Sequence, residues 1–107
     1  MLNKVLEYLD RNLEKNLEHL FSLLRCQSIS TDPAYKDECR KTADWLVEDL
    51  KSIGFAASRR DTPGHPMVVG HHPGPFDDCL HVLFYGHYDV QPVDPLDLWE
   101  NNPFEPS

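Results

Sequence analysis

Basic residues are scarce in this sequence. Lys and Arg together number 10 against 18 Asp and Glu, which gives a formal net charge of −8 at pH 7. Nucleic acids and anionic membrane surfaces are bound through basic patches, and the sequence contains no such patch. We therefore expect no nucleic-acid partner and no membrane partner.

Cysteines and long apolar runs are also few. Cys26, Cys39 and Cys79 form an odd set without Cys-x-x-Cys spacing, so we expect three reduced thiols rather than a disulfide framework or a zinc knuckle. No stretch approaches the roughly 20 apolar residues of a membrane span. Charged residues interrupt the N-terminal segment before the apolar core of a signal peptide could form. A cytoplasmic location is the resulting expectation.

The first part of the chain has the pattern of a long amphipathic helix. Apolar residues recur there at steps of three and four, and charged residues between them form a solvated face. The resulting apolar stripe is expected to pack against another part of the protein. It consists of Leu2, Val5, Leu6, Leu9, Leu13, Leu17, Leu20, Phe21 and Leu24.

A second helix is predicted after the break at residues 28–33. Asp32 followed by Pro33 is typical of an N-cap with proline at the first helical position. Gly54 stands where a left-handed residue commonly ends a helix. The apolar side of this helix is expected to comprise Cys39, Ala43, Leu46, Val47, Leu50 and Ile53.

Three strands are predicted after the second helix. The segments FAASRR (55–60) and MVVGHH (67–72) are short and separated by turn signals. CLHVLFY (79–85) is almost continuously apolar and rich in β-favouring residues, which is typical of a strand covered on both faces. The order of two helices and then three strands indicates an α/β arrangement with helices packed on a mixed sheet.

The chemistry of the sequence is concentrated after the third predicted strand. Ligands bind at the carboxyl edges of open α/β sheets, where this chain has His87 and Asp89. On an extended backbone these two side chains point to the same side and Tyr88 to the other. An imidazole is a good zinc ligand, and a carboxylate two residues later can orient it or bind the metal itself. The spacing alone also fits a hydrogen-bonded histidine at a strand end and an aspartate that caps a turn.

Other polar residues are weaker candidates. His71 and His72 are adjacent, so on a strand they point to opposite faces and are not expected to chelate one ion. His81 lies inside the third predicted strand and is interpreted as a core histidine. Asp94 and Asp97 are interpreted as solvated loop carboxylates. The sequence has no Gly-x-Ser-x-Gly nucleophile elbow and no glycine-rich phosphate loop.

The stretch FYGHYDVQPVDPLDLWENNPFEP, residues 84–106, resembles the signature around the first metal ligand of the co-catalytic zinc exopeptidases and deacylases. This family includes carnosinase, bacterial dipeptidases, acetylornithine deacetylase, succinyl-diaminopimelate desuccinylase and carboxypeptidase G. The form Gly-His-Tyr-Asp-Val-Gln-Pro, followed by a tryptophan and Pro-Phe-x-Pro, is most similar to the dipeptidase and carnosinase branch. STDPAY (30–35) and the Gly-Phe pair at 54–55 are also similar to that branch, so the resemblance covers essentially the whole chain.

The resemblance implies roles for two residues. His87 corresponds to the histidine that binds one of two zinc ions, and Asp89 to the catalytic aspartate that supports it beside the metal. The other acidic and histidine ligands of the family, and its general-base glutamate, have no counterpart in this sequence. Residues 1–107 are therefore expected to be the N-terminal portion of a three-layer α/β/α catalytic domain, without a second domain and with at most one partial zinc site.

The implied function is a metal-dependent hydrolase that cleaves a peptide or amide bond with a two-zinc-activated water. Its substrate would be a small peptide or an N-acyl amino acid, and the complete enzyme could form a homodimer. The 107-residue chain by itself is expected to be inactive. The alternative is a truncated, non-catalytic product or an interaction partner without hydrolase activity, and the sequence that follows Ser107 would separate the two.

Overall fold

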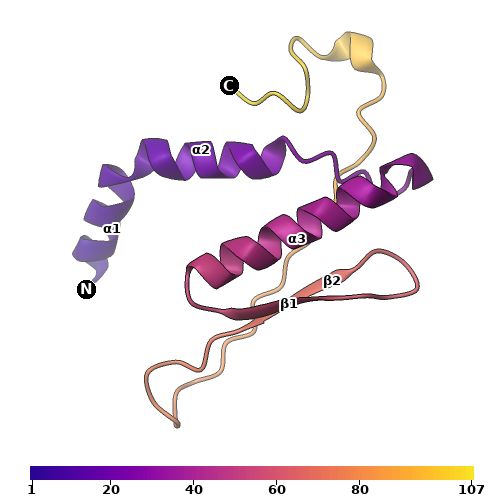
Figure 1. Cartoon of the computed structure of the whole chain (residues 1–107). Helices are drawn as coiled ribbons and strands as arrows, with labels where there is room; N and C mark the ends of the chain where they lie inside the picture. The colour runs from indigo at the N-terminus through magenta and orange to yellow at the C-terminus, as the bar shows by residue number, and fades with distance from the viewer. The chain divides into compact units, whose positions relative to one another are not determined.

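Two units make up the chain in the computed structural model, which describes residues 1–107 (Figure 1). One unit comprises residues 1–26 and 93–107, and the other comprises residues 27–92. The second unit contains both residues of the predicted metal site.

The long helix predicted at the N-terminus is two helices, α1 (Leu2–Arg11) and α2 (Leu13–Leu24). Asn12 separates them, with φ −110° and ψ 14°. Its side-chain amide donates a hydrogen bond of 2.8 Å to the Tyr8 carbonyl, and its backbone N–H contacts the same oxygen at 3.1 Å. Asparagine side chains that bond the local backbone compete with regular helix geometry, and the periodic pattern of the apolar residues did not reveal this break.

The apolar stripe of these helices lies exposed. Neither helix has a buried residue, and Val5, for example, is 50% exposed. No helix of the protein combines the length and apolarity that crossing a bilayer requires.

The second unit is built on α3 (Lys36–Ser52). A 3-10 turn, η1 (Pro33–Tyr35), precedes it, and the Asp32 carboxylate accepts a hydrogen bond of 2.9 Å from the Ala34 N–H. The predicted cap and proline position are thus confirmed, although the first turn is 3-10 rather than α-helical. Gly54 follows the helix with φ 97°, the left-handed conformation predicted for it.

A β-hairpin packs against α3. Strands β1 (Ala56–Arg60) and β2 (Met67–His71) are antiparallel, and Ala56 is paired with His71. At Gly70 a Cβ atom would lie 3.2 Å from Leu50 Cδ1, so the missing side chain lets the strand approach the helix closely. The buried face of α3 consists of Cys39, Thr42, Ala43 and Val47. Ile53, predicted to share this face, is 64% exposed because the helix has ended before it.

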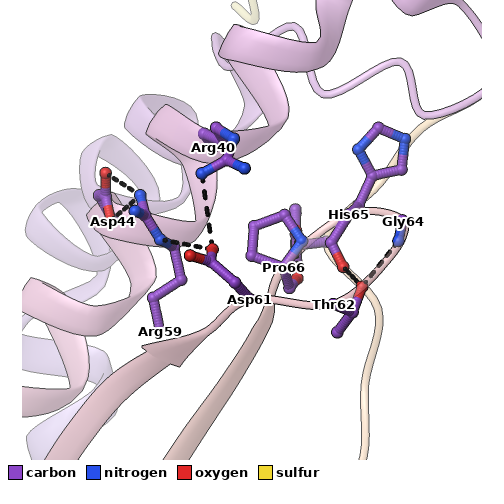
Figure 2. Close-up of polar contacts among 9 residues, drawn as sticks. Arg40, Asp44, Arg59, Asp61, Thr62, Gly64, His65 and Pro66 are labelled. Carbon is purple, nitrogen blue, oxygen red and sulfur yellow. Dashed lines mark hydrogen bonds and ion pairs between the residues drawn. The ribbon is translucent and has the colours of Figure 1, made fainter.

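Ion pairs connect α3 to the end of β1 (Figure 2). Arg59 Nη1 lies 2.8 Å from both carboxylate oxygens of Asp44. Arg59 Nε and Arg40 Nη1 also approach Asp61 Oδ1, at 3.6 and 3.5 Å. These side chains are partly exposed, so their contribution to stability is modest.

The third predicted strand does not form. Residues 79–85 belong to no helix and no sheet, and Leu80 and Phe84 are 94% and 91% exposed. A strand obtains its backbone hydrogen bonds from a neighbouring strand, whereas here the two-stranded sheet contains only β1 and β2. The prediction of a mixed three-stranded sheet was therefore wrong for this chain. The interpretation of His81 as a core residue was also wrong, because His81 is exposed.

The cysteines provide a test of the packing around α3. All three are free, as predicted, and Cys39 is fully buried. Burial, assisted by the nearby charge of Asp89, raises the pKa of the Cys39 thiol, and the thiolate is the reactive form. Iodoacetamide should therefore modify Cys26 and Cys79 well before Cys39, and urea should abolish the difference. Mass spectrometry after timed labelling measures the order, and equal native labelling of Cys39 and Cys79 would contradict this packing.

The exposed apolar surfaces predict self-association of the isolated 107-residue chain. Exposed apolar segments favour aggregation, and the apolar side chains of residues 80–85 are at least 86% exposed. Replacing Leu83 and Phe84 by lysine should lower the associated fraction measured by sedimentation velocity. A monomeric chain with a cooperative thermal transition and a concentration-independent midpoint would count against this expectation.

Candidate metal centre

The segment that carries the predicted site lies beside the residues before η1. Ile29 and Val90 form an isolated parallel β-bridge, and the Val90 N–H donates a hydrogen bond of 3.0 Å to the Ser28 carbonyl. The Ser28 hydroxyl in turn donates to the Tyr88 carbonyl at 2.6 Å. Ser28 and Ile29 are 2% and 3% exposed, so this contact is part of the core and fixes the register of the site residues.

His87 and Asp89 contact each other directly. His87 Nδ1 lies 3.0 Å from Asp89 Oδ1 and 3.2 Å from the Asp89 carbonyl oxygen. The tautomer that satisfies both oxygens carries its proton on Nδ1, which leaves the lone pair of Nε2 available. The His87 side chain is 76% exposed. The predicted arrangement on one side of the backbone thus produces an imidazole oriented by a carboxylate, with its other nitrogen directed away from that carboxylate.

Ser30 supplies a second contact to the same carboxylate. Its hydroxyl donates a hydrogen bond of 2.6 Å to Asp89 Oδ2. This bond is the main reason why the pKa of Asp89 lies below its ordinary value; partial burial acts in the opposite direction, and the hydrogen bond with His87 lowers the pKa further. The carboxylate is therefore charged at neutral pH and is held through both oxygens.

Ser30 is itself held by the hairpin turn. His65 Nε2 lies 2.7 Å from the Ser30 carbonyl oxygen. The Thr62 hydroxyl donates to the His65 carbonyl at 2.7 Å and accepts from the Gly64 N–H at 3.1 Å (Figure 2). Sequence patterns did not predict that Ser30, Thr62 and His65 contribute to the site. The alternation of serine, isoleucine and serine at residues 28–30 is typical of a short extended segment. This pattern could have indicated that Ser28 and Ser30 point to the same side.

Tyr88 anchors the segment to the hairpin turn. Its hydroxyl donates a hydrogen bond of 2.6 Å to the carbonyl of Pro66, a buried residue. Burial raises the pKa of Tyr88, and the nearby Cys39 and Asp89 act in the same direction. The tyrosine therefore remains a neutral donor over the physiological pH range.

His87 and Asp89 bring together two potential metal donors, fewer than a zinc site requires. One imidazole nitrogen and one carboxylate suit a zinc-type centre, but the structure has no group of three or more His, Cys, Asp and Glu side chains that could hold an ion. His72 is used structurally, because its Nδ1 accepts a hydrogen bond of 3.1 Å from the Gly74 N–H and its ring packs 5.4 Å from that of Phe55.

Comparison with known proteins gives similar relatives over most of the chain. A Cys-Gly metallodipeptidase of Schizosaccharomyces pombe is 27% identical over 96% of this chain and 24% of its own length. A cysteinylglycine-S-conjugate dipeptidase of Corynebacterium striatum is 28% identical over 88% of this chain and 21% of its own length. A succinyl-diaminopimelate desuccinylase of Aromatoleum aromaticum is 33% identical over 78% of this chain and 21% of its own length.

No protein-family profile and no solved structure matches the chain. The chain spans between a fifth and a quarter of the length of these relatives. The similarity therefore concerns one segment of much longer proteins.

Tyr88 provides a test of how the site segment is anchored. Tyr88→Phe removes the hydroxyl that bonds the Pro66 carbonyl and should lower the free energy of unfolding by about 1 kcal/mol. Urea unfolding at low protein concentration measures the change. Tyr85→Phe is the matched control, because the Tyr85 side chain is exposed and its replacement should have no effect. Equal unfolding midpoints for Tyr88→Phe and the wild type would show that the anchor contributes nothing.

Proposed function

We propose that this chain, a distant homologue of Cys-Gly metallodipeptidases and of a succinyl-diaminopimelate desuccinylase, is the first segment of a metal-dependent hydrolase of peptide or amide bonds. The observation that carries the proposal is the contact of 3.0 Å between His87 Nδ1 and the Asp89 carboxylate. It leaves Nε2 of an exposed imidazole for a metal in a chain that is homologous to metal-dependent dipeptidases.

His87 and Asp89 have separate roles in this proposal. His87 binds a zinc ion through Nε2. Asp89 accepts the Nδ1 proton, fixes the tautomer and the ring orientation, and makes the imidazole a stronger donor through its negative charge. Asp89 can perform this role at neutral pH because its own hydrogen bonds keep it ionised. When bound, zinc would polarise the substrate carbonyl and activate a water molecule.

The proposed substrate is a small dipeptide or an N-acyl amino acid. This class follows from the names of the relatives, which act on Cys-Gly, cysteinylglycine S-conjugates and succinyl-diaminopimelate. A two-metal centre needs more ligands than residues 1–107 bring together. In the proposed enzyme the remaining ligands and the general base come from sequence outside these residues, so the activity belongs to the complete protein.

A non-catalytic role is the second candidate. The observation that favours it is the absence of a third metal-binding side chain near His87 and Asp89. A 107-residue product would then keep the hydrogen-bonded pair without a metal and would hydrolyse nothing. The two functions differ in zinc content, which is measurable independently of substrate choice.

Replacement of His87 by alanine tests the metal assignment. In the full-length protein, His87→Ala should reduce the bound zinc and should lower Cys-Gly hydrolysis by at least about 100-fold, because a direct ligand is lost. Zinc is measured by elemental analysis after dialysis, and hydrolysis by release of glycine. His81→Ala is the matched control, since His81 is exposed and has no role in the site. Unchanged zinc content and activity in His87→Ala would rule out the assignment.

A further inference from the structure

Ser30 is the one side chain that fixes the Asp89 carboxylate from outside its own segment. Its hydroxyl lies 2.6 Å from Asp89 Oδ2, while His87 Nδ1 lies 3.0 Å from Oδ1. The two bonds use different oxygens, so the carboxylate is clamped between a donor 59 residues away in the sequence and the histidine that it orients. Without the hydroxyl, the carboxylate could rotate about its side-chain bonds, and only the contact with an exposed imidazole would oppose this rotation.

Two contacts fix the backbone of Ser30 and therefore the position of its hydroxyl. On one side, the bridge between Ile29 and Val90 aligns the two segments. On the other, His65 Nε2 contacts the Ser30 carbonyl at 2.7 Å. Ser30 therefore reaches Asp89 from a backbone that is anchored to both the site segment and the hairpin turn, which is the condition for an effective positioning group.

We propose that Ser30 is a positioning residue of the metal centre, whose hydroxyl holds the Asp89 carboxylate in the orientation that keeps the proton of His87 on Nδ1 and Nε2 free for the metal. The inference rests on the proposed function of His87 and adds a determinant of metal affinity outside the histidine–aspartate pair. Outer partners of metal ligands typically change affinity or activity by about 10- to 100-fold when they are removed.

Ser28 provides a matched control for the structural effect of losing a serine. Both hydroxyls donate hydrogen bonds of 2.6 Å to the same short segment, but Ser28 bonds the Tyr88 backbone carbonyl whereas Ser30 bonds the Asp89 side chain. Ser28 is also the more buried of the two. Ser28→Ala should therefore disturb the fold at least as much as Ser30→Ala without touching the carboxylate.

The first experiment reads the tautomer of His87 in the metal-free full-length protein. Long-range proton–nitrogen NMR correlations, recorded at a pH where the imidazole is neutral, distinguish Nδ1–H from Nε2–H. The wild type and Ser28→Ala should show the Nδ1–H form, Ser30→Ala should move toward the Nε2–H form that free histidine prefers, and Ser30→Thr should restore Nδ1–H. Retention of the Nδ1–H form in Ser30→Ala would overturn the proposal.

The second experiment measures the zinc affinity of the full-length protein by competition with a chelator. Ser30→Ala should weaken zinc binding by up to about 10-fold, the lower end of the range for direct partners of a ligand, because it acts through Asp89; Ser28→Ala and Ser30→Thr should stay close to the wild type. If His87→Ala loses zinc but Ser30→Ala and Ser28→Ala behave alike, the positioning role is wrong and the proposed function stands. If His87→Ala binds zinc like the wild type, the proposed function is wrong, and the positioning role of Ser30 is wrong with it.

Discussion

The bridge between Ile29 and Val90 is the constraint on which the site depends. It joins two segments that are distant in the sequence, and the flanking backbone hydrogen bond from the Val90 N–H to the Ser28 carbonyl sets its register. A slip of one residue would turn every side chain of the extended segment to its opposite face. His87 and Asp89 would still share a side, but both would face away from Ser30, and its hydroxyl would no longer reach the carboxylate.

Asp89 connects this packing to the chemistry of the site. Its two oxygens are shared between Ser30 and His87, and its charge contributes to the raised pKa values of Cys39 and Tyr88 beside it. The Cys39 thiol and the Tyr88 hydroxyl therefore stay neutral while the Asp89 carboxylate stays ionised. One negative charge next to one imidazole is the electrostatic arrangement that supports a metal-binding histidine.

The parts that the sequence predicted correctly depend on local interactions. The cap at Asp32, the left-handed Gly54 and the two short strands each follow from residues a few positions apart, and the contact between His87 and Asp89 spans two residues. The hydrogen bond from Ser30 spans 59 residues, so no local pattern could predict it. The same reason explains the error at residues 79–85, because an apolar pattern indicates a preference for a buried strand but does not supply the neighbouring strand.

The central claim is that His87 binds a metal through Nε2. The most direct measurement is anomalous diffraction at the zinc edge from crystals of the full-length protein grown with zinc. The account predicts an anomalous peak at about 2.0–2.1 Å from His87 Nε2, with Asp89 still in contact with Nδ1. A zinc peak at a centre that excludes His87, or a His87 imidazole without metal in a zinc-loaded crystal, would contradict it.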